Sequence, residues 1–230
     1  MAQQKKLQKS SLPQLIFVDK LPWFWLWGII YLAIVVFGLF WPTSIFVSIL
    51  KIFGIALCLV FVWRYFHEDR LIQIAFLFTL TADIILAFNN TAAYGVLVFA
   101  FAQLTHFARI CQKPTLSKIW LIVSILLLVC IFVLPIPDPI VCFGIVYGIT
   151  LAANLFMSLR YVHQERNRKT VCNAIGFTLF VCCDLLVAVS FFANIGVLPG
   201  FLLGIANYCC WLFYLPSQIF IANSGEDVIQ

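Results

Sequence analysis

The sequence predicts an all-α, polytopic membrane protein with eight transmembrane helices, and two observations lead to this fold class. Of the 230 residues, 64% are hydrophobic and only 10% are charged, whereas soluble domains are about 25% charged. The apolar residues also gather in eight runs, each near the roughly 20 residues that a helix needs to cross a bilayer. We therefore expect a multi-pass protein of a bacterial inner membrane or a eukaryotic endomembrane, in contact with the lipid bilayer.

The first two runs follow a polar N-terminal segment, 1–20, which we expect to lie in the cytoplasm. The run 21–40 is too long for the core of a signal peptide and lacks a small-residue cleavage site, so we expect a helix. Tryptophans near its start are typical of the membrane interface, and Trp41-Pro42 ends it. The second run, 44–65, contains Lys51.

The remaining six runs complete a transmembrane domain, 21–222, that leaves a short cytoplasmic tail, 223–230. Two of these runs each contain one aspartate, and three others carry polar residues at helical spacing. The expected helices are 70–88, 92–111, 117–134, 140–160, 170–193 and 199–222.

The basic residues orient these helices in the membrane. With both termini in the cytoplasm, the N-terminal segment and the cytoplasmic loops hold 13 of the 14 lysines and arginines. The predicted outer loops hold none, and the remaining one is Lys51. Cytoplasmic loops of membrane proteins carry an excess of Lys and Arg, so this distribution supports eight helices with both termini inside.

Two stretches that resemble each other are candidates for the functional centre. FTLTADIILAF (78–88) and LFVCCDLLVAV (179–189) each place one carboxylate, Asp83 or Asp184, inside an apolar run. An ionised group at that depth costs at least ~2.5–3.5 kcal/mol, so such residues are functional candidates. The alternative is a buried ion pair that only holds helices together. Each stretch lies in the third helix of a half, which suggests a parallel 4+4 repeat.

Helix geometry places three charged residues at a similar depth. At 1.5 Å per residue, Asp83 lies ~20 Å and Asp184 ~22 Å from the cytoplasmic start of its helix. Lys51 lies ~21 Å from the cytoplasmic end of its own helix. We expect Lys51 within ion-pair or single-water distance of one or both aspartates, because an isolated charge is costly in hydrocarbon.

Polar residues recur on one face of three further helices. They are Asn207, Trp211, Tyr214 and Gln218 in 199–222, Tyr147, Thr150 and Asn154 in 140–160, and Gln103 and His106 in 92–111. These stripes predict a polar cavity that extends from the level of the carboxylates towards the cytoplasm. The alternative is hydrogen bonding between helices that only holds the bundle together.

Nothing in the sequence predicts a metal, a cofactor or a nucleic-acid partner. The nine cysteines lie in apolar runs without a CxxC pair, so we expect small buried hydrophobic residues instead of a metal site. The sequence has no glycine-rich phosphate loop and no Ser-His-Asp arrangement. Membrane-facing loops account for the net charge of +5.

Three stretches and one lysine carry a resemblance to a known family. Residues 78–86 are similar to the stretch FSLLGDxLL, with Asp83 as its aspartate. Residues 179–188 are similar to FxxSDxxLA, with Asp184 as its aspartate. Residues 213–222, with Tyr214 and Gln218, are similar to YYxAQxLI, and the lysine is Lys51. On these residues the chain resembles, from about Lys51 to Ser224, the lysoplasmalogenase or YhhN-like family. Members of that family are eight-helix membrane proteins.

Five positions depart from the family pattern and bear on substrate choice. Ala82, Cys183 and Ile52 stand where the family has glycine, serine and proline. Gln103 and His106 stand where we expect histidine and tyrosine. Both aspartates are retained, so chemistry that depends on them is compatible with this chain.

The resemblance implies hydrolysis of the vinyl-ether bond of a lysophospholipid, lysoplasmalogen, to a fatty aldehyde and a glycerophospho-ethanolamine or -choline. Vinyl ethers cleave by protonation at carbon, through an oxocarbenium ion that water attacks. Two carboxylates in different protonation states can supply the acid and the base, in either order. The expected residues are Asp83 and Asp184 in catalysis, Lys51 as a supporting charge, and Gln103, Asn207, Tyr214 and Gln218 in positioning substrate or water.

Other functions are open on the sequence. Intramembrane charges with a parallel repeat also suit a proton-coupled transporter or a channel for a small amphiphile. A non-catalytic lipid-binding or scaffold protein is a third class. Cytoplasmic arginines such as Arg109 could hold a lipid phosphate, or could simply follow the positive-inside rule. Release of aldehyde in detergent, where no gradient exists, distinguishes the enzyme from the transporter.

Overall fold

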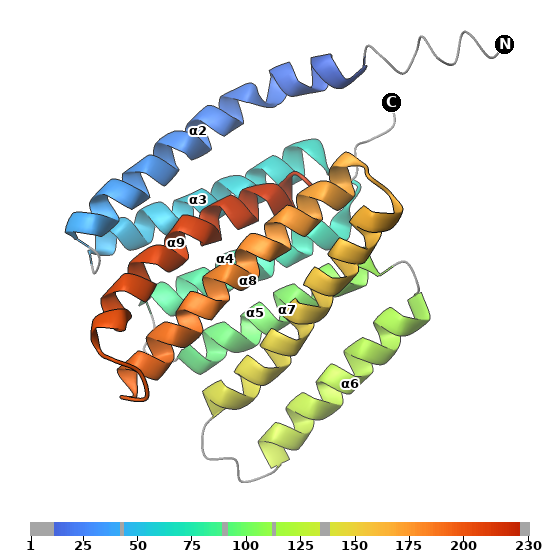
Figure 1. Cartoon of the computed structure of the whole chain (residues 1–230). Helices are drawn as coiled ribbons and strands as arrows, with labels where there is room; N and C mark the ends of the chain where they lie inside the picture. Colours follow the sequence, from blue (N-terminus) through green and yellow to red (C-terminus); the bar gives the residue numbers. More distant parts are fainter. Residues whose placement is uncertain (1–11, 42–43, 89–91, 112–113, 134–138, 226–230) are drawn as a thin grey trace, which may run out of the picture.

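The computed structural model describes residues 12–41, 44–88, 92–111, 114–133 and 139–225, and in them it contains eight α-helices (Figure 1). They are α2 (Leu12–Phe40), α3 (Ile45–Tyr65), α4 (Arg70–Phe88), α5 (Ala92–Ile110), α6 (Pro114–Val133), α7 (Pro139–Gln164), α8 (Arg168–Asn194) and α9 (Phe201–Ala222). Among the described residues, seven helices are long and apolar enough to cross a membrane. The predicted class, an all-α polytopic membrane protein, is confirmed.

The helix boundaries agree with the predicted ones within four residues, except at the N-terminus. There α2 begins at Leu12, so the end of the segment expected to be a polar extension, 1–20, is helical. Pro13 does not prevent this, because a proline in the first turn of a helix removes no intrahelical hydrogen bond. The rest of the two predicted terminal segments, 1–11 and 226–230, lies outside the described residues.

Local signals in the sequence explain where several helices begin and end. Ser44 precedes α3 and its hydroxyl accepts a hydrogen bond from the backbone N–H of Phe46 at 3.3 Å. Asn167 precedes α8 and forms a capping box with Thr170. After α8 the chain turns at Gly196, whose φ of +79° lies in the left-handed region that glycine adopts without strain.

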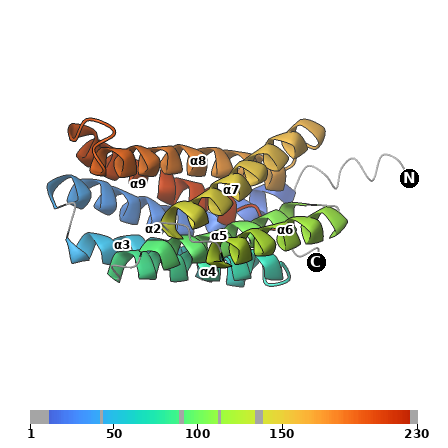
Figure 2. The same ribbon diagram turned by 90° about the horizontal axis from the view of Figure 1, so that it is seen from below.

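The two halves of the chain pack in a pseudo-symmetric way. The fourth helix of each half contacts the first and second helices of the other half, since α9 contacts α2 and α3 while α5 contacts α6 and α7. The first helices, α2 and α6, lie at opposite edges of the bundle in Figure 1. The third helices, α4 and α8, lie on opposite faces in Figure 2. This arrangement agrees with the predicted parallel repeat.

Basic residues gather at the end of the bundle where α3, α5 and α9 end. Arg109 is 3% exposed, and its Nη1 lies 3.5 Å from Asp69 Oδ2. Its Nη2 donates to Asn173 Oδ1 at 2.6 Å and to Ser224 Oγ at 2.8 Å. Arg168 donates to two backbone carbonyls just after α9, an end that attracts cations. Arg109 is therefore held by protein groups, and this end corresponds to the predicted cytoplasmic side.

Helices α8 and α9 approach each other closely at Gly176. A Cβ atom added there would lie 2.6 Å from Ile221 Cγ1 and 3.0 Å from Ile221 N. Only glycine allows the two backbones to pack at this distance. The contact holds α8, which carries Asp184, beside α9, which carries Tyr214.

Candidate active site

Both membrane-embedded aspartates line one cavity of about 160 Å³. Asp83 comes from α4 and Asp184 from α8, while α5, α7 and α9 supply the rest of the wall. Apart from these carboxylates, most of the lining is aliphatic or aromatic, with residues such as Val96, Phe99 and Phe180. The structure therefore brings two acids together in a largely apolar space.

Asp83 is held by Tyr214 on α9. The Tyr214 hydroxyl lies 2.8 Å from Asp83 Oδ2 and 3.0 Å from Asp83 Oδ1, so its proton is shared between both carboxylate oxygens. The side chain of Asp83 is 9% exposed. The Tyr214 ring packs edge-on against Trp211 and Phe180, with ring centroids 5.1 Å and 5.7 Å away. This packing fixes the direction of the hydroxyl.

Asp184 is held by a different tyrosine. The hydroxyl of Tyr147 donates to Asp184 Oδ2. Tyr147 lies on α7, the second helix of the same half, whereas the partner of Asp83 lies on the fourth helix of the opposite half. The two aspartates thus occupy equivalent positions in the repeat but have non-equivalent partners. Tyr147 was absent from the predicted site residues, although its spacing with Thr150 and Asn154 marked it as part of a polar stripe.

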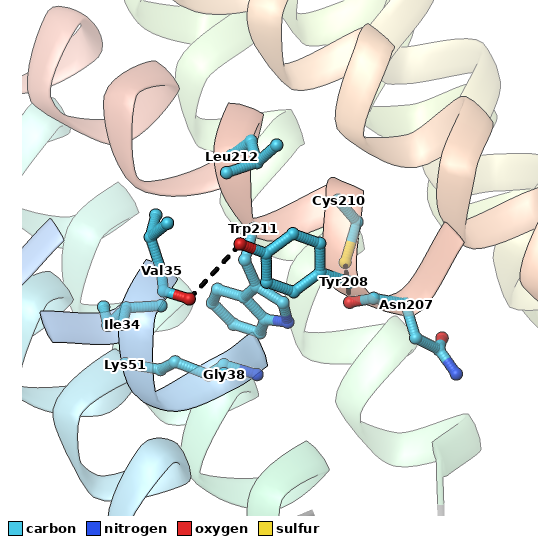
Figure 3. A pocket seen from close by; sticks show the side chains of 9 residues that line it. All are labelled: Ile34, Val35, Gly38, Lys51, Asn207, Tyr208, Cys210, Trp211 and Leu212. Atoms are coloured by element: carbon cyan, nitrogen blue, oxygen red, sulfur yellow. Dashed lines mark hydrogen bonds between the residues drawn. The ribbon is translucent and has the colours of Figure 1, made fainter. Parts of the chain in front are cut away.

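Lys51 lies in an adjoining pocket of about 240 Å³, together with Asn207, Tyr208 and Trp211 (Figure 3). Its Nζ is 3.9 Å from the centroid of the Trp211 ring, a close cation–π contact. The ammonium therefore lies over the electron-rich face of the indole. Cys210 and Trp211 line both this pocket and the carboxylate cavity, so the two spaces are neighbours.

The direct ion pair expected for Lys51 does not form in the part of the chain that the structure describes. No carboxylate oxygen of Asp83 or Asp184 lies within 4.0 Å of its ammonium. The physical reason is that both aspartates accept hydrogen bonds from tyrosines while Trp211 covers the ammonium. A contact through a single water stays a prediction.

The other predicted site residues lie at different places around the cavity. Gln103 does not line it, and its side-chain oxygen accepts a hydrogen bond from Asn154 Nδ2 at 2.9 Å. This pair joins α5 to α7, as the alternative of bundle-holding hydrogen bonds expects. Gln218 is fully buried and also does not line the cavity. Asn207 lies in the Lys51 pocket, where its Oδ1 accepts from Ser190 Oγ at 2.6 Å.

An apolar groove of about 510 Å³ between α7 and α8 opens beside the carboxylate cavity. The two spaces share Tyr147, Asp184, Val96 and Val187. Asp184 is therefore reached both from the cavity and from the groove. Within the described ranges, no three His, Cys, Asp or Glu side chains are grouped so that they could hold a metal ion.

Comparison with known proteins identifies a family. No curated protein and no solved structure matches the chain. The model of the YhhN family matches residues 46–225. This range contains both aspartates, both tyrosines that bind them and Lys51. Because the match covers well over half of the sequence, the chain belongs to the YhhN family.

Proposed function

We propose that this protein is a membrane-embedded hydrolase that cleaves the vinyl-ether bond of lysoplasmalogen. The observation that carries the proposal is the shared cavity of Asp83 and Asp184, in which each carboxylate has its own tyrosine. Membership of the YhhN family and the resemblance to lysoplasmalogenases support it. The products are a fatty aldehyde and a glycerophospho-ethanolamine or -choline.

The reaction needs one acid and one base in the same small space. The acid protonates the vinyl carbon that is β to the ether oxygen, and the remaining positive charge is shared between that oxygen and the α carbon. A water then adds to the α carbon and gives its proton to the base. The resulting hemiacetal breaks its C–O bond to release the aldehyde and the alcohol, with no net change in protons. General acid–base catalysis of this kind contributes typically ~10²–10⁴-fold in rate.

The two tyrosines favour a division of roles between the aspartates. Tyr214 donates to both oxygens of Asp83, so this carboxylate is suited to remain ionised, to stabilise the oxocarbenium ion and to accept a proton from water. Asp184 accepts one hydrogen bond, at Oδ2, and its Oδ1 has no hydrogen-bond partner among the described residues. That oxygen can carry the proton that is delivered to carbon. Asp184 is therefore assigned as the acid and Asp83 as the base.

One observation favours a second candidate, a proton-coupled transporter or channel for a small amphiphile. Two halves that pack pseudo-symmetrically, each with an intramembrane aspartate, are typical of transporters built from parallel repeats. The two candidates differ in one property that is simple to measure. An enzyme releases aldehyde from its substrate in detergent, where no gradient can drive transport.

The test uses the purified full-length protein in detergent with lysoplasmalogen, and with an acyl lysophospholipid as the control substrate. Parent protein should release aldehyde from the first only. Asp83→Asn and Asp184→Asn keep the side-chain volume but cannot exchange the catalytic proton, so each should lose ~10²–10⁴-fold in activity. The double variant should be scarcely worse than either, since residues that act as a unit are non-additive.

Each variant should elute from size exclusion like the parent, which separates chemistry from folding. Parent protein that releases no aldehyde overturns the proposal. An Asn variant that folds and keeps more than about a tenth of the parental activity removes that aspartate from the mechanism.

A further inference from the structure

Three spaces lie next to one another in a row within the bundle. The apolar groove between α7 and α8 meets the carboxylate cavity at Tyr147 and Asp184. The carboxylate cavity meets the Lys51 pocket at Trp211 and Cys210. An apolar space, a pair of acids and a cation thus follow one another. This order matches the parts of a single-chain phospholipid, which are a hydrocarbon chain, an ether linkage and a phosphate.

We propose that the Lys51 pocket binds the phosphate of a single-chain lysophospholipid and that the groove between α7 and α8 binds its hydrocarbon chain. This inference rests on the proposed function, because it places the scissile vinyl ether between the two ends, at the aspartates. Lys51 is then a binding residue for the headgroup instead of a partner for a carboxylate.

The surroundings of Lys51 fit an anionic ligand. Its ammonium contacts the Trp211 ring and forms no ion pair with a carboxylate among the described residues. A partly buried cation without a direct ion pair is stabilised by an anion that enters its pocket. Asn207 also lines this pocket, but its side chain points away from Lys51 and its Oδ1 accepts from Ser190 Oγ (Figure 3). Lys51 therefore supplies the charge that a phosphate in this pocket meets.

The groove fits the first part of an alkenyl chain. Its wall on α7 extends from Ile140 to Ala152. Tyr147, where the groove meets the carboxylate cavity, lies ~10 Å from Ile140, so about half of an extended long-chain hydrocarbon lies along this wall. Two glycines, Gly144 and Gly148, line it, and a Cβ atom added at either would meet nothing within 4 Å. The missing side chains leave room against the helix for methylene groups.

The proposal also sets the orientation of the lipid. Lys51 lies only ~9 Å from Ile45, the start of α3, at the end of the bundle away from the arginines. Arg109, at the opposite end, is already held by Asp69 and Asn173. The phosphate therefore lies in the half of the membrane opposite the basic end, and substrate enters sideways from that leaflet.

The phosphate site is tested by binding of two probes that cannot undergo vinyl-ether cleavage. These are 1-O-hexadecyl lysophosphatidylethanolamine and 1-O-hexadecylglycerol, which lacks the phosphate. Lys51→Gln should weaken binding of the phospholipid at least tenfold and change binding of the glycerol ether less than twofold. Lys51→Arg should restore most of the affinity. Arg64→Gln, which removes an exposed cation at the basic end, is the matched control and should change neither.

The chain site is tested by filling the groove. Gly144→Leu should weaken binding of both the hexadecyl phospholipid and its octyl analogue at least tenfold, because Gly144 lies only ~4.5 Å along α7 from Tyr147 and both chains pass it. Gly28→Leu is the matched control, since Gly28 also has open space around it but lies on α2, away from the groove. It should leave both affinities unchanged.

The outcomes separate this inference from the proposed function. Parent protein that binds the phospholipid as predicted but releases no aldehyde from lysoplasmalogen overturns the function and leaves the binding site in place. Lys51→Gln that weakens both probes equally, or neither, overturns the phosphate site. Gly144→Leu that leaves binding of both chain lengths unchanged overturns the chain site. A parent that binds neither probe overturns both assignments.

Discussion

Removal of one hydroxyl, in Tyr214→Phe, tests whether the hydrogen bond to Asp83 contributes to activity. The substitution deletes the group that lies 2.8 Å and 3.0 Å from the two carboxylate oxygens. It keeps the ring, whose edge-on contacts with Trp211 and Phe180 depend on shape alone. The change is therefore confined to the donor, and the backbone of α9 has no reason to move.

The size of the expected effect follows from the charge on the acceptor. A hydrogen bond to a charged group contributes ~1.5–3 kcal/mol. If this bond holds the Asp83 carboxylate in its catalytic position, its loss corresponds to a decrease in kcat of roughly 10- to 150-fold, at 1.36 kcal/mol per tenfold. KM should change little, because Tyr214 lies in the carboxylate cavity and outside the groove and the Lys51 pocket.

The assay is aldehyde release from lysoplasmalogen by purified protein, with thermal unfolding of each variant measured in the same detergent. Tyr31→Phe is the matched control. It removes a tyrosine hydroxyl that donates to the Leu212 carbonyl at 3.2 Å, on the contact of α2 with α9 and away from the carboxylates. It should keep at least half of the parental kcat. A Tyr214→Phe protein within threefold of the parent would refute the role given to this hydrogen bond.

Two further predictions concern stability and topology. Arg109→Gln removes a buried guanidinium from an ion pair and two side-chain hydrogen bonds. It should therefore lower the free energy of unfolding by ~3–5 kcal/mol and leave KM unchanged. An unaltered melting temperature would contradict this. Cysteines introduced at Val197 and Arg166 should react with impermeant reagents from opposite sides of the membrane, since they flank the two ends of α8; labelling from one side would overturn the eight-helix topology.

The parts of the site that could be predicted were those signalled within a single helix. Asp83 and Asp184 stood out because a carboxylate in an apolar run is costly wherever that run packs. Their common depth followed from the rise per residue, and in the structure both line one cavity. Tyr214 was identified by its place on a polar face and by a family stretch, yet its contact with Asp83 was not.

The partners of the charged groups could not be read from the sequence. Lys51 was expected within ion-pair or single-water distance of an aspartate, because the three charges share one depth. Depth alone does not say which way a helix is rotated. In the structure Lys51 lies over Trp211 instead. Gln103 was expected at the cavity because it lies on a polar stripe, and in the structure it binds Asn154 between α5 and α7. Tyr147 was recognised as part of a polar stripe, but its hydrogen bond to Asp184 on the next helix was not predicted.

The sequence by itself determined the fold class, the number of helices, their approximate ends and the membership of a family. These depend on the length of apolar runs, on capping residues and on the placement of charges, all of which are local in the chain. Only the tertiary structure decided which groups meet. The hydrogen bond between Tyr214 and Asp83 joins residues 131 positions apart, and that between Tyr147 and Asp184 joins residues 37 apart. Such contacts depend on the rotation of each helix about its axis, which is set by close packing such as that of α8 on α9 at Gly176.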